Sequence, residues 1–246
     1  MAPAVFLPTP PVFDAVTALG IGGLAVLMAV VVVGLRMRYE RVNPWPTAAV
    51  IGGWMLVTAT LANAGLLARV DRAPAPMAVM LPLILALPMV MALSPLGGRL
   101  AAALPIAALV GLQMFRLPLE LVMHRAAELG IMPSELSYSG YNLDIVTGTG
   151  AAVLFLALRV AAVPRAAVWA WNAWGLWCLA VIAWVARSGS PMVRAFGDDP
   201  RHVNTWVLYF PYVWLPTVLV MIALSGHLVL TRALLRPARD SSTRDA

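Results

Sequence analysis

Four polar residues recur along one apolar stretch of the chain, and their side chains suit ion binding and proton exchange. Gln113, Arg116, Glu120 and His124 fall within about 80° of arc when the stretch is drawn as an α-helix. A guanidinium binds anions, whereas carboxyl and imidazole groups exchange protons. A charge at the centre of a bilayer costs about 2.5 kcal/mol or more unless it is paired. We therefore expect this polar stripe to face the interior of a helix bundle.

A second polar group, Asn142 and Asp144, begins the next apolar stretch. Acidic residues are favoured at a helix N-terminus, which places a helix start here. The i,i+4 spacing predicts an ion pair between Arg116 and Glu120. We expect Asp144 to meet Arg116 or His124 and to orient the imidazole of His124.

The segment that joins the two groups contains three residues that interrupt regular structure, Gly130, Pro133 and Gly140. It therefore either folds over the polar residues as a lid or dips among them.

Together these residues form one candidate binding site. Its members are Gln113, Arg116, Glu120, His124, Asn142 and Asp144. Arg116 would hold an anionic group, and Glu120 and His124 are the candidates for a catalytic acid and base. Three interpretations stay open: an ion-pair network that fixes packing, a site for a substrate, ion or proton, and a metal site. One histidine with carboxylates is a thin ligand set, so we predict neither a metal nor a cofactor.

Composition indicates that these residues lie in a membrane protein. Of the 246 residues, 61% are hydrophobic and 11% are charged, whereas soluble domains carry about 25% charged residues. Repeated apolar runs match the length that crosses a bilayer. The sequence predicts an all-α polytopic membrane bundle of about seven transmembrane helices, forming a single domain over residues 1–235, with a disordered cytoplasmic tail at 236–246. The predicted helices are 12–35, 46–68, 77–93, 100–123, 143–163, 166–186 and 205–230. Prolines in the third helix could break it or make it re-entrant.

The basic residues set an orientation and a source. All 17 are arginines, which excludes a lysine Schiff-base pigment and suggests a GC-rich bacterial genome. Arginines are commoner in the segments that lie inside if the N-terminus is outside, so we predict an N-out, C-in protein of the bacterial inner membrane. The N-terminus lacks the basic residues of a signal peptide. The net charge of +6 comes from arginines at helix ends and does not indicate nucleic-acid binding.

The predicted function is an integral membrane protein with a polar pocket in its outer half, which binds a small molecule, ion or lipid head group in a transport-like role. The alternatives are an intramembrane enzyme acting on a lipid-soluble substrate and a structural or assembly partner of a membrane complex. The predicted partners are the bilayer and a small molecule, a lipid or another membrane protein.

His227 is predicted to lie apart from this site. In a last helix over 205–230, it falls near the inner face, roughly a membrane thickness from the polar stripe, with a packing or snorkelling role.

Several motifs resemble a family of uncharacterised multi-pass bacterial inner-membrane proteins. The resemblance rests on F-R-x-P-x-E-x-x-x-H at 115–124, on Pro133, on G-x-N-x-D-I-x-x-G at 140–148, on W-L-P at 214–216 and on H-L at 227–228. It covers about a quarter of the chain and implies a polar site within the membrane, without an assigned activity. The family has an acidic residue before the glycine at 140 and an arginine after it, where this chain has Ser139 and Tyr141.

Overall fold

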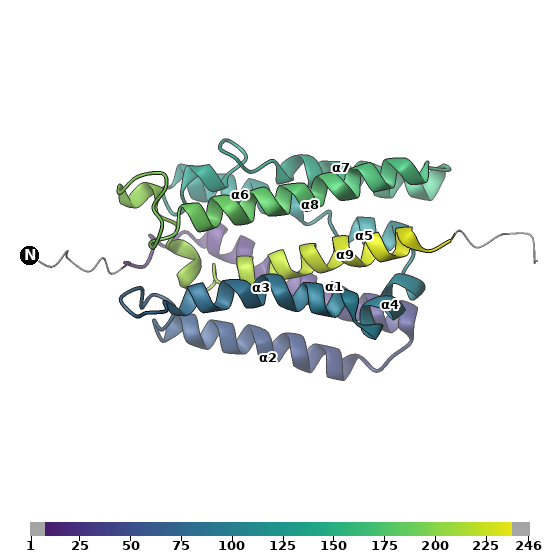
Figure 1. Ribbon diagram of the computed structural model, residues 1–246, viewed down its shortest axis with the longest axis horizontal. Helices are drawn as coiled ribbons and strands as arrows, with labels where there is room; N and C mark the ends of the chain where they lie inside the picture. Colours follow the sequence, from purple (N-terminus) through teal and green to yellow (C-terminus); the bar gives the residue numbers. More distant parts are fainter. Residues whose placement is uncertain (1–7, 238–246) are drawn as a thin grey trace, which may run out of the picture.

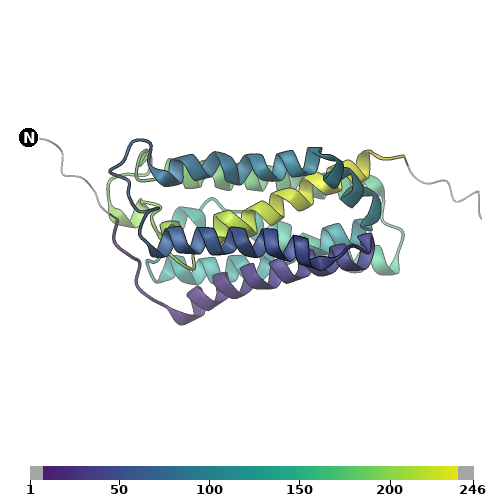
Figure 2. The ribbon, with the colours of Figure 1, turned by 90° about the horizontal axis from the view of Figure 1, so that it is seen from below.

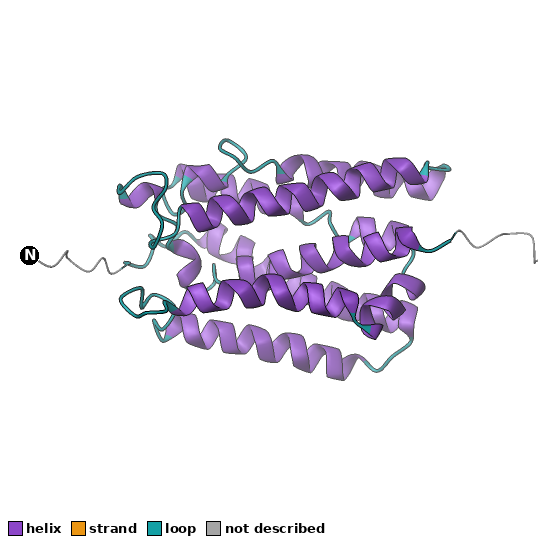
Figure 3. Cartoon of the chain, viewed as in Figure 1, coloured by secondary structure: helices purple, strands orange, loops and turns teal. Residues whose placement is uncertain are grey.

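The computed structural model describes residues 8–237, which form a bundle of helices without a strand. The long helices run side by side along one axis, and the first and last described residues lie at opposite ends of the bundle (Figure 1). Most of the connections between the long helices lie at the two ends of the bundle (Figure 3). Six helical segments in the described part are long and apolar enough to cross a membrane: α1 (Ala15–Glu40), α2 (Pro44–Asn63), α3 (Pro76–Leu93), Ile106–Glu128, α8 (Arg165–Ser188) and Leu215–Leu235. The fold is therefore compatible with a multi-pass membrane protein.

Shorter elements complete the chain. They are α4 (Pro95–Ala103), α5 (Ile106–Gly111), α6 (Arg116–Glu128), η1 (Ser134–Leu136), α7 (Asp144–Val160), η2 (Pro200–His202), η3 (Trp206–Leu208), η4 (Leu215–Val220) and α9 (Met221–Leu235).

The fifth predicted transmembrane helix corresponds to α7, which has 17 residues. At 1.5 Å per residue it is about 26 Å long, slightly less than the roughly 30 Å of a hydrocarbon core. Seven spans and the N-out orientation therefore stay predictions. Most of the predicted disordered tail, residues 238–246, lies outside the described residues.

The third predicted helix is continuous, although α3 contains Pro82 and Pro88. The chain breaks one residue after α3 instead, at Ser94, whose hydroxyl accepts from the backbone N–H of Leu96 at 3.1 Å and caps α4. Arg232 of α9 donates to the carbonyls of Ser94, at 2.8 Å, and of Ala92. A half-buried arginine thus satisfies carbonyls that the break leaves open.

The predicted helix over 100–123 is wrong as one continuous element, because the chain divides it into α4, α5 and α6. Pro105 holds the preceding Leu104 in an extended conformation, which ends α4. Between α5 and α6 the backbone hydrogen bonds join residues three apart rather than four, as in a 3₁₀-helix; an example is Met114 N–H to Gly111 O at 3.1 Å. Pro118 cannot donate to the carbonyl of Met114, and Leu117 N–H donates to it instead, at 3.1 Å.

The last helix is displaced along the chain from its predicted position at 205–230. It starts at Leu215 with a π-helical turn, η4, and continues through α9 to Leu235. Pro211 and Pro216 lack the N–H groups that a regular helix through this region needs. Trp54 of α2 donates to Thr217 O at 2.7 Å and so satisfies a carbonyl of the π-helical turn.

Helix α9 occupies the centre of the bundle, as Figure 2 shows, and packs against α3, α4, α5 and α8. Helix α7 packs against α5, α6 and α8. The polar stripe of α6 therefore meets α7 and α9 in the interior of the bundle.

An ion pair near one end of the bundle joins α1 to α6. Asp14 caps α1 by accepting from Thr17 N–H at 2.9 Å, and it pairs with Arg125 at 3.0 Å. The hydrogen bonds from Arg125 and Thr17 hold the pKa of Asp14 well below its usual value.

We predict that Asp14→Asn, which keeps a capping oxygen but loses the charge, lowers the melting temperature at pH 7. Because the folded-state pKa is depressed, this stabilisation is present above the unfolded pKa of about 3.9 and is lost as pH falls below it. Tryptophan fluorescence melts in detergent from pH 7 to pH 3 should show the gap to wild type closing below about pH 4. Asp198→Asn, in an exposed loop, is the control, and a gap that does not change with pH would contradict the prediction.

Candidate functional site

Arg116, the first residue of α6, lies at the centre of a buried polar network. Its side chain is 1% exposed. The guanidinium forms an ion pair with Asp144 and donates through Nη1 to His227 Nε2 at 2.9 Å. One arginine thereby joins α6, α7 and α9.

The hydrogen bonds of the network determine the tautomer of His227. Arginine has no acceptor atom, so Nε2 of His227 must accept and the proton must be on Nδ1. His227 Nδ1 donates to Asn172 Oδ1 at 2.9 Å, and Asn172 Nδ2 donates to Thr231 Oγ1 at 2.8 Å. The hydroxyl of Thr231 in turn donates to His227 O at 2.9 Å. His227 is thus a neutral imidazole held by α6, α8 and its own helix.

Asp144 begins α7 beside the first turn of α6. Its backbone N–H donates to Asn142 Oδ1 at 3.1 Å, which satisfies one of the open donors at the start of the helix. A Cβ at Gly148 would overlap the backbone of Leu117, so α7 needs glycine there to approach α6 this closely. The approach brings the Asp144 carboxylate to the Arg116 guanidinium.

Glu120 is buried without a cationic partner among the described residues. Its side chain is 1% exposed, and Oε1 accepts from Asn142 Nδ2 at 2.8 Å. Its other oxygen, Oε2, has no hydrogen-bond partner within residues 8–237. The predicted pair of Arg116 with Glu120 does not form in this part of the chain, because Asp144 and His227 take the guanidinium instead. An arginine that precedes its glutamate at i,i+4 is also the weaker of the two orientations.

Two further acceptor oxygens near His227 are unsatisfied. Gln113 donates through Nε2 to Ala223 O at 3.1 Å, one turn before His227 on α9, but its Oε1 has no partner in the described chain. Thr147, on the same helix as Asp144, has a buried hydroxyl without a partner in that part of the chain. Together with Glu120 Oε2, three buried side-chain oxygens of the network thus lack a partner in the described chain.

His124 lies outside this network, about 12 Å along α6 from Arg116. Its Nδ1 contacts Ser137 Oγ at 3.0 Å, its ring stacks on Tyr138 with centroids 4.3 Å apart, and its Nε2 lies 3.6 Å from Glu128. Asp144 therefore does not orient His124, since its carboxylate faces Arg116.

The segment between α6 and α7 dips into the bundle, one of the two arrangements expected from its sequence. Ile131, Met132, Leu136, Ser137 and Asn142 are all buried. Irregular backbone at membrane depth is tolerated only where protein covers it. Asn142 Nδ2 donates to Leu136 O at 3.1 Å, and Asn142 N–H donates to Ser137 O at 3.2 Å, so the segment binds itself at the level of Glu120.

The prediction that His227 lies apart from the site is wrong. His227 is fully buried and contacts Arg116 directly. The helix that carries it runs from Leu215 to Leu235, so His227 lies near its middle rather than at its end. The network accordingly lies near the middle of the bundle.

The sequence reasoning also missed Asn172, Thr147 and Thr231. One signal was present, because His227 and Thr231 are polar residues at i,i+4 in an apolar helix and so share a face. Asn172 is the one amide in the tryptophan-rich α8.

No protein family, curated protein or solved structure matches this chain. The family resemblance inferred from motifs stays an expectation.

The arrangement can exchange protons and bind small polar groups. It contains one guanidinium, two carboxyl groups and a neutral imidazole, so the second carboxyl group has no cation to balance it. Within residues 8–237 no group of three or more His, Cys, Asp or Glu residues could hold a metal ion.

We predict that Arg116 and Asp144 couple strongly in a double-mutant cycle. Arg116→Gln or Asp144→Asn alone leaves a buried charge unpaired and should cost about 3–5 kcal/mol of unfolding free energy. The double variant should cost clearly less than the sum, as measured by unfolding in mixed SDS micelles. In the matched cycle, Arg116→Gln and Glu120→Gln should show a smaller coupling energy. A larger coupling energy for Arg116 with Glu120 than with Asp144 would contradict the prediction and favour the i,i+4 ion pair.

We also predict that Gly175→Ala disrupts the packing around His227. An added Cβ at Gly175 would overlap the imidazole ring, and overpacking of this kind costs about 1–3 kcal/mol. The control is Gly52→Ala in α2, where the added Cβ meets nothing within 4 Å. Thermal melts should show a lower melting temperature for the first variant only, and equal values would argue against a tightly packed His227.

Proposed function

We propose that the chain is a multi-pass protein of the bacterial inner membrane that moves protons at Glu120 in a transport-like role. Of the ligands predicted for the polar pocket, a small molecule, an ion or a lipid head group, this proposal selects the proton. The observation that carries the proposal is the free Oε2 of Glu120, 1% exposed and without a paired cation in the described chain. A buried carboxyl group in this state is stable when it holds a proton, and a structure that opens toward water lets it release one.

The segment between α6 and α7, here called the re-entrant segment, supports a route between Glu120 and one end of the bundle. His124 is partly exposed and contacts Ser137, whose carbonyl accepts from Asn142, and Asn142 donates to Glu120. In the proposal His124 receives protons at the surface. The amide groups of the segment 137–142 do not themselves carry protons; they hold His124 and Glu120 along one path, which water completes when the structure opens. Arg116 and Asp144 neutralise each other and hold the helices in place.

A structural role is the second candidate. The ion pair of Arg116 with Asp144 and its bond to His227 join three helices, which is what a packing network would do. In that case the wild type would take up protons no faster than protein-free liposomes.

The test is proton uptake into liposomes that contain the purified protein and a pH-sensitive dye, driven by a potassium diffusion potential. Wild type should exceed protein-free liposomes, and Glu120→Gln should fall to their rate because glutamine cannot carry a proton. His124→Gln should slow uptake less.

Asp198→Asn is the control, since Asp198 is an exposed carboxylate in a loop away from the network. Melting curves of each variant check folding. Equal uptake by Glu120→Gln and Asp198→Asn, or a wild-type rate no higher than that of protein-free liposomes, would refute the proposal.

A further inference from the structure

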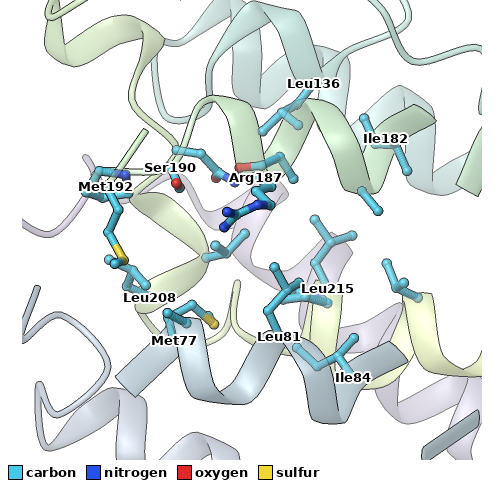
Figure 4. Close-up of a pocket in the computed structure, with 18 of the residues that line it drawn as sticks. Met77, Leu81, Ile84, Leu136, Ile182, Arg187, Ser190, Met192, Leu208 and Leu215 are labelled. Carbon is cyan, nitrogen blue, oxygen red and sulfur yellow. Dashed lines mark hydrogen bonds between the residues drawn. The ribbon is translucent and has the colours of Figure 1, made fainter. Parts of the chain in front are cut away.

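A cavity of about 150 Å³ lies between α3, α8 and the segment that leads into α9, apart from the polar network. Figure 4 shows side chains from these elements converging on it. Its walls are mainly apolar, with Leu81 and Ile84 on one side, Ile182 on the other, and Leu215 between them. Along α3 the lining runs from Met77 to Leu85, which is about 12 Å of helix.

One end of the cavity is positively charged and open to the surface. Arg187 lies in the last turn of α8; it is an exposed residue whose guanidinium points toward the cavity (Figure 4). No hydrogen bond or ion pair joins its side chain to any residue within 8–237. Ser190 lies beside it at the same end.

Asn204 also lines the cavity. It is 8% exposed, and its Nδ2 donates to Ala186 O at 3.2 Å. Its Oδ1 has no partner in the described part of the chain, but that atom is buried and does not face the cavity. Arg187 therefore determines what binds at this end, and it requires an anion.

We propose that this cavity binds the head-group end of one acyl chain of an anionic phospholipid such as phosphatidylglycerol. The apolar walls hold this part of the chain between α3 and α8. The phosphodiester accepts from Arg187, a contact that arginine makes through two parallel N–H groups. This site is distinct from the proposed proton site and does not depend on it.

The charge of the site selects among membrane lipids. Phosphatidylcholine carries no net charge, and its ammonium group opposes Arg187. An arginine that merely snorkels toward the surface would bind either lipid phosphate without such preference. Selectivity for phosphatidylglycerol over phosphatidylcholine therefore distinguishes a specific lipid-binding site from an arginine that contacts any lipid phosphate.

The experiment reconstitutes the full chain in nanodiscs of equimolar phosphatidylglycerol and phosphatidylcholine, transfers it to mild detergent, and measures retained lipid by native mass spectrometry. Wild type should retain one phosphatidylglycerol. Arg187→Gln should reduce retention about 10-fold or more, the usual effect of losing a charge-assisted hydrogen bond.

Two further variants complete the design. Ala183→Phe fills the apolar part of the cavity without changing charge, and it should lose the lipid as well. Arg72→Gln removes an exposed arginine from the α2–α3 connection, outside the cavity, and should retain the lipid. Equal retention by Arg187→Gln and wild type, equal binding of phosphatidylcholine, or a free fatty acid in place of the phospholipid would overturn the proposal.

Discussion

The buried guanidinium of Arg116 is the constraint on which the rest of the bundle depends. A charge at 1% exposure must be paired and its N–H groups must be satisfied, or the folded state loses several kcal/mol. Asp144 supplies the countercharge and His227 an acceptor, so α6, α7 and α9 must meet at one level. Asn172 of α8 then fixes the other side of the imidazole. Four elements are thus positioned by the needs of one side chain.

The interrupted helices follow from this constraint. Asp144 reaches Arg116 because α7 begins inside the bundle, and α7 can begin there because the segment after α6 dips in and satisfies its own backbone. The turn before Arg116 ends α5 and starts α6 at the level of the ion pair. Continuous helices would pack more simply, but α7 would then begin near the end of α6, away from Arg116.

The sequence predicted the helical class, the apolar segments and the buried charged residues Arg116, Glu120 and Asp144, because these depend on composition and helical periodicity. It did not predict partners, which depend on where helices start. Placing the last helix at 205–230 rather than from Leu215 moved its start by ten residues, or about 15 Å, and so removed His227 from the site. The i,i+4 rule predicted that Arg116 pairs with Glu120 of its own helix. The guanidinium pairs with Asp144 of α7 instead, and a rule about neighbours on one helix cannot predict a partner on another.

The pattern of unsatisfied atoms argues that the network does more than hold helices together. A polar network that only holds helices together is most stable when every polar atom is hydrogen-bonded, since each buried polar atom left without a partner costs about 1–3 kcal/mol. Here Arg116 and His227 are well satisfied, while Gln113, Glu120 and Thr147 each keep a free oxygen. Asn142 joins the ion pair of Arg116 and Asp144 to the partly unsatisfied Glu120, because it hydrogen-bonds both Asp144 and Glu120. Asn142 also binds the carbonyl of Leu136, whose side chain lines the apolar cavity. The segment between α6 and α7 therefore contacts Asp144 of the ion pair, the carboxyl group of Glu120 and the cavity at once.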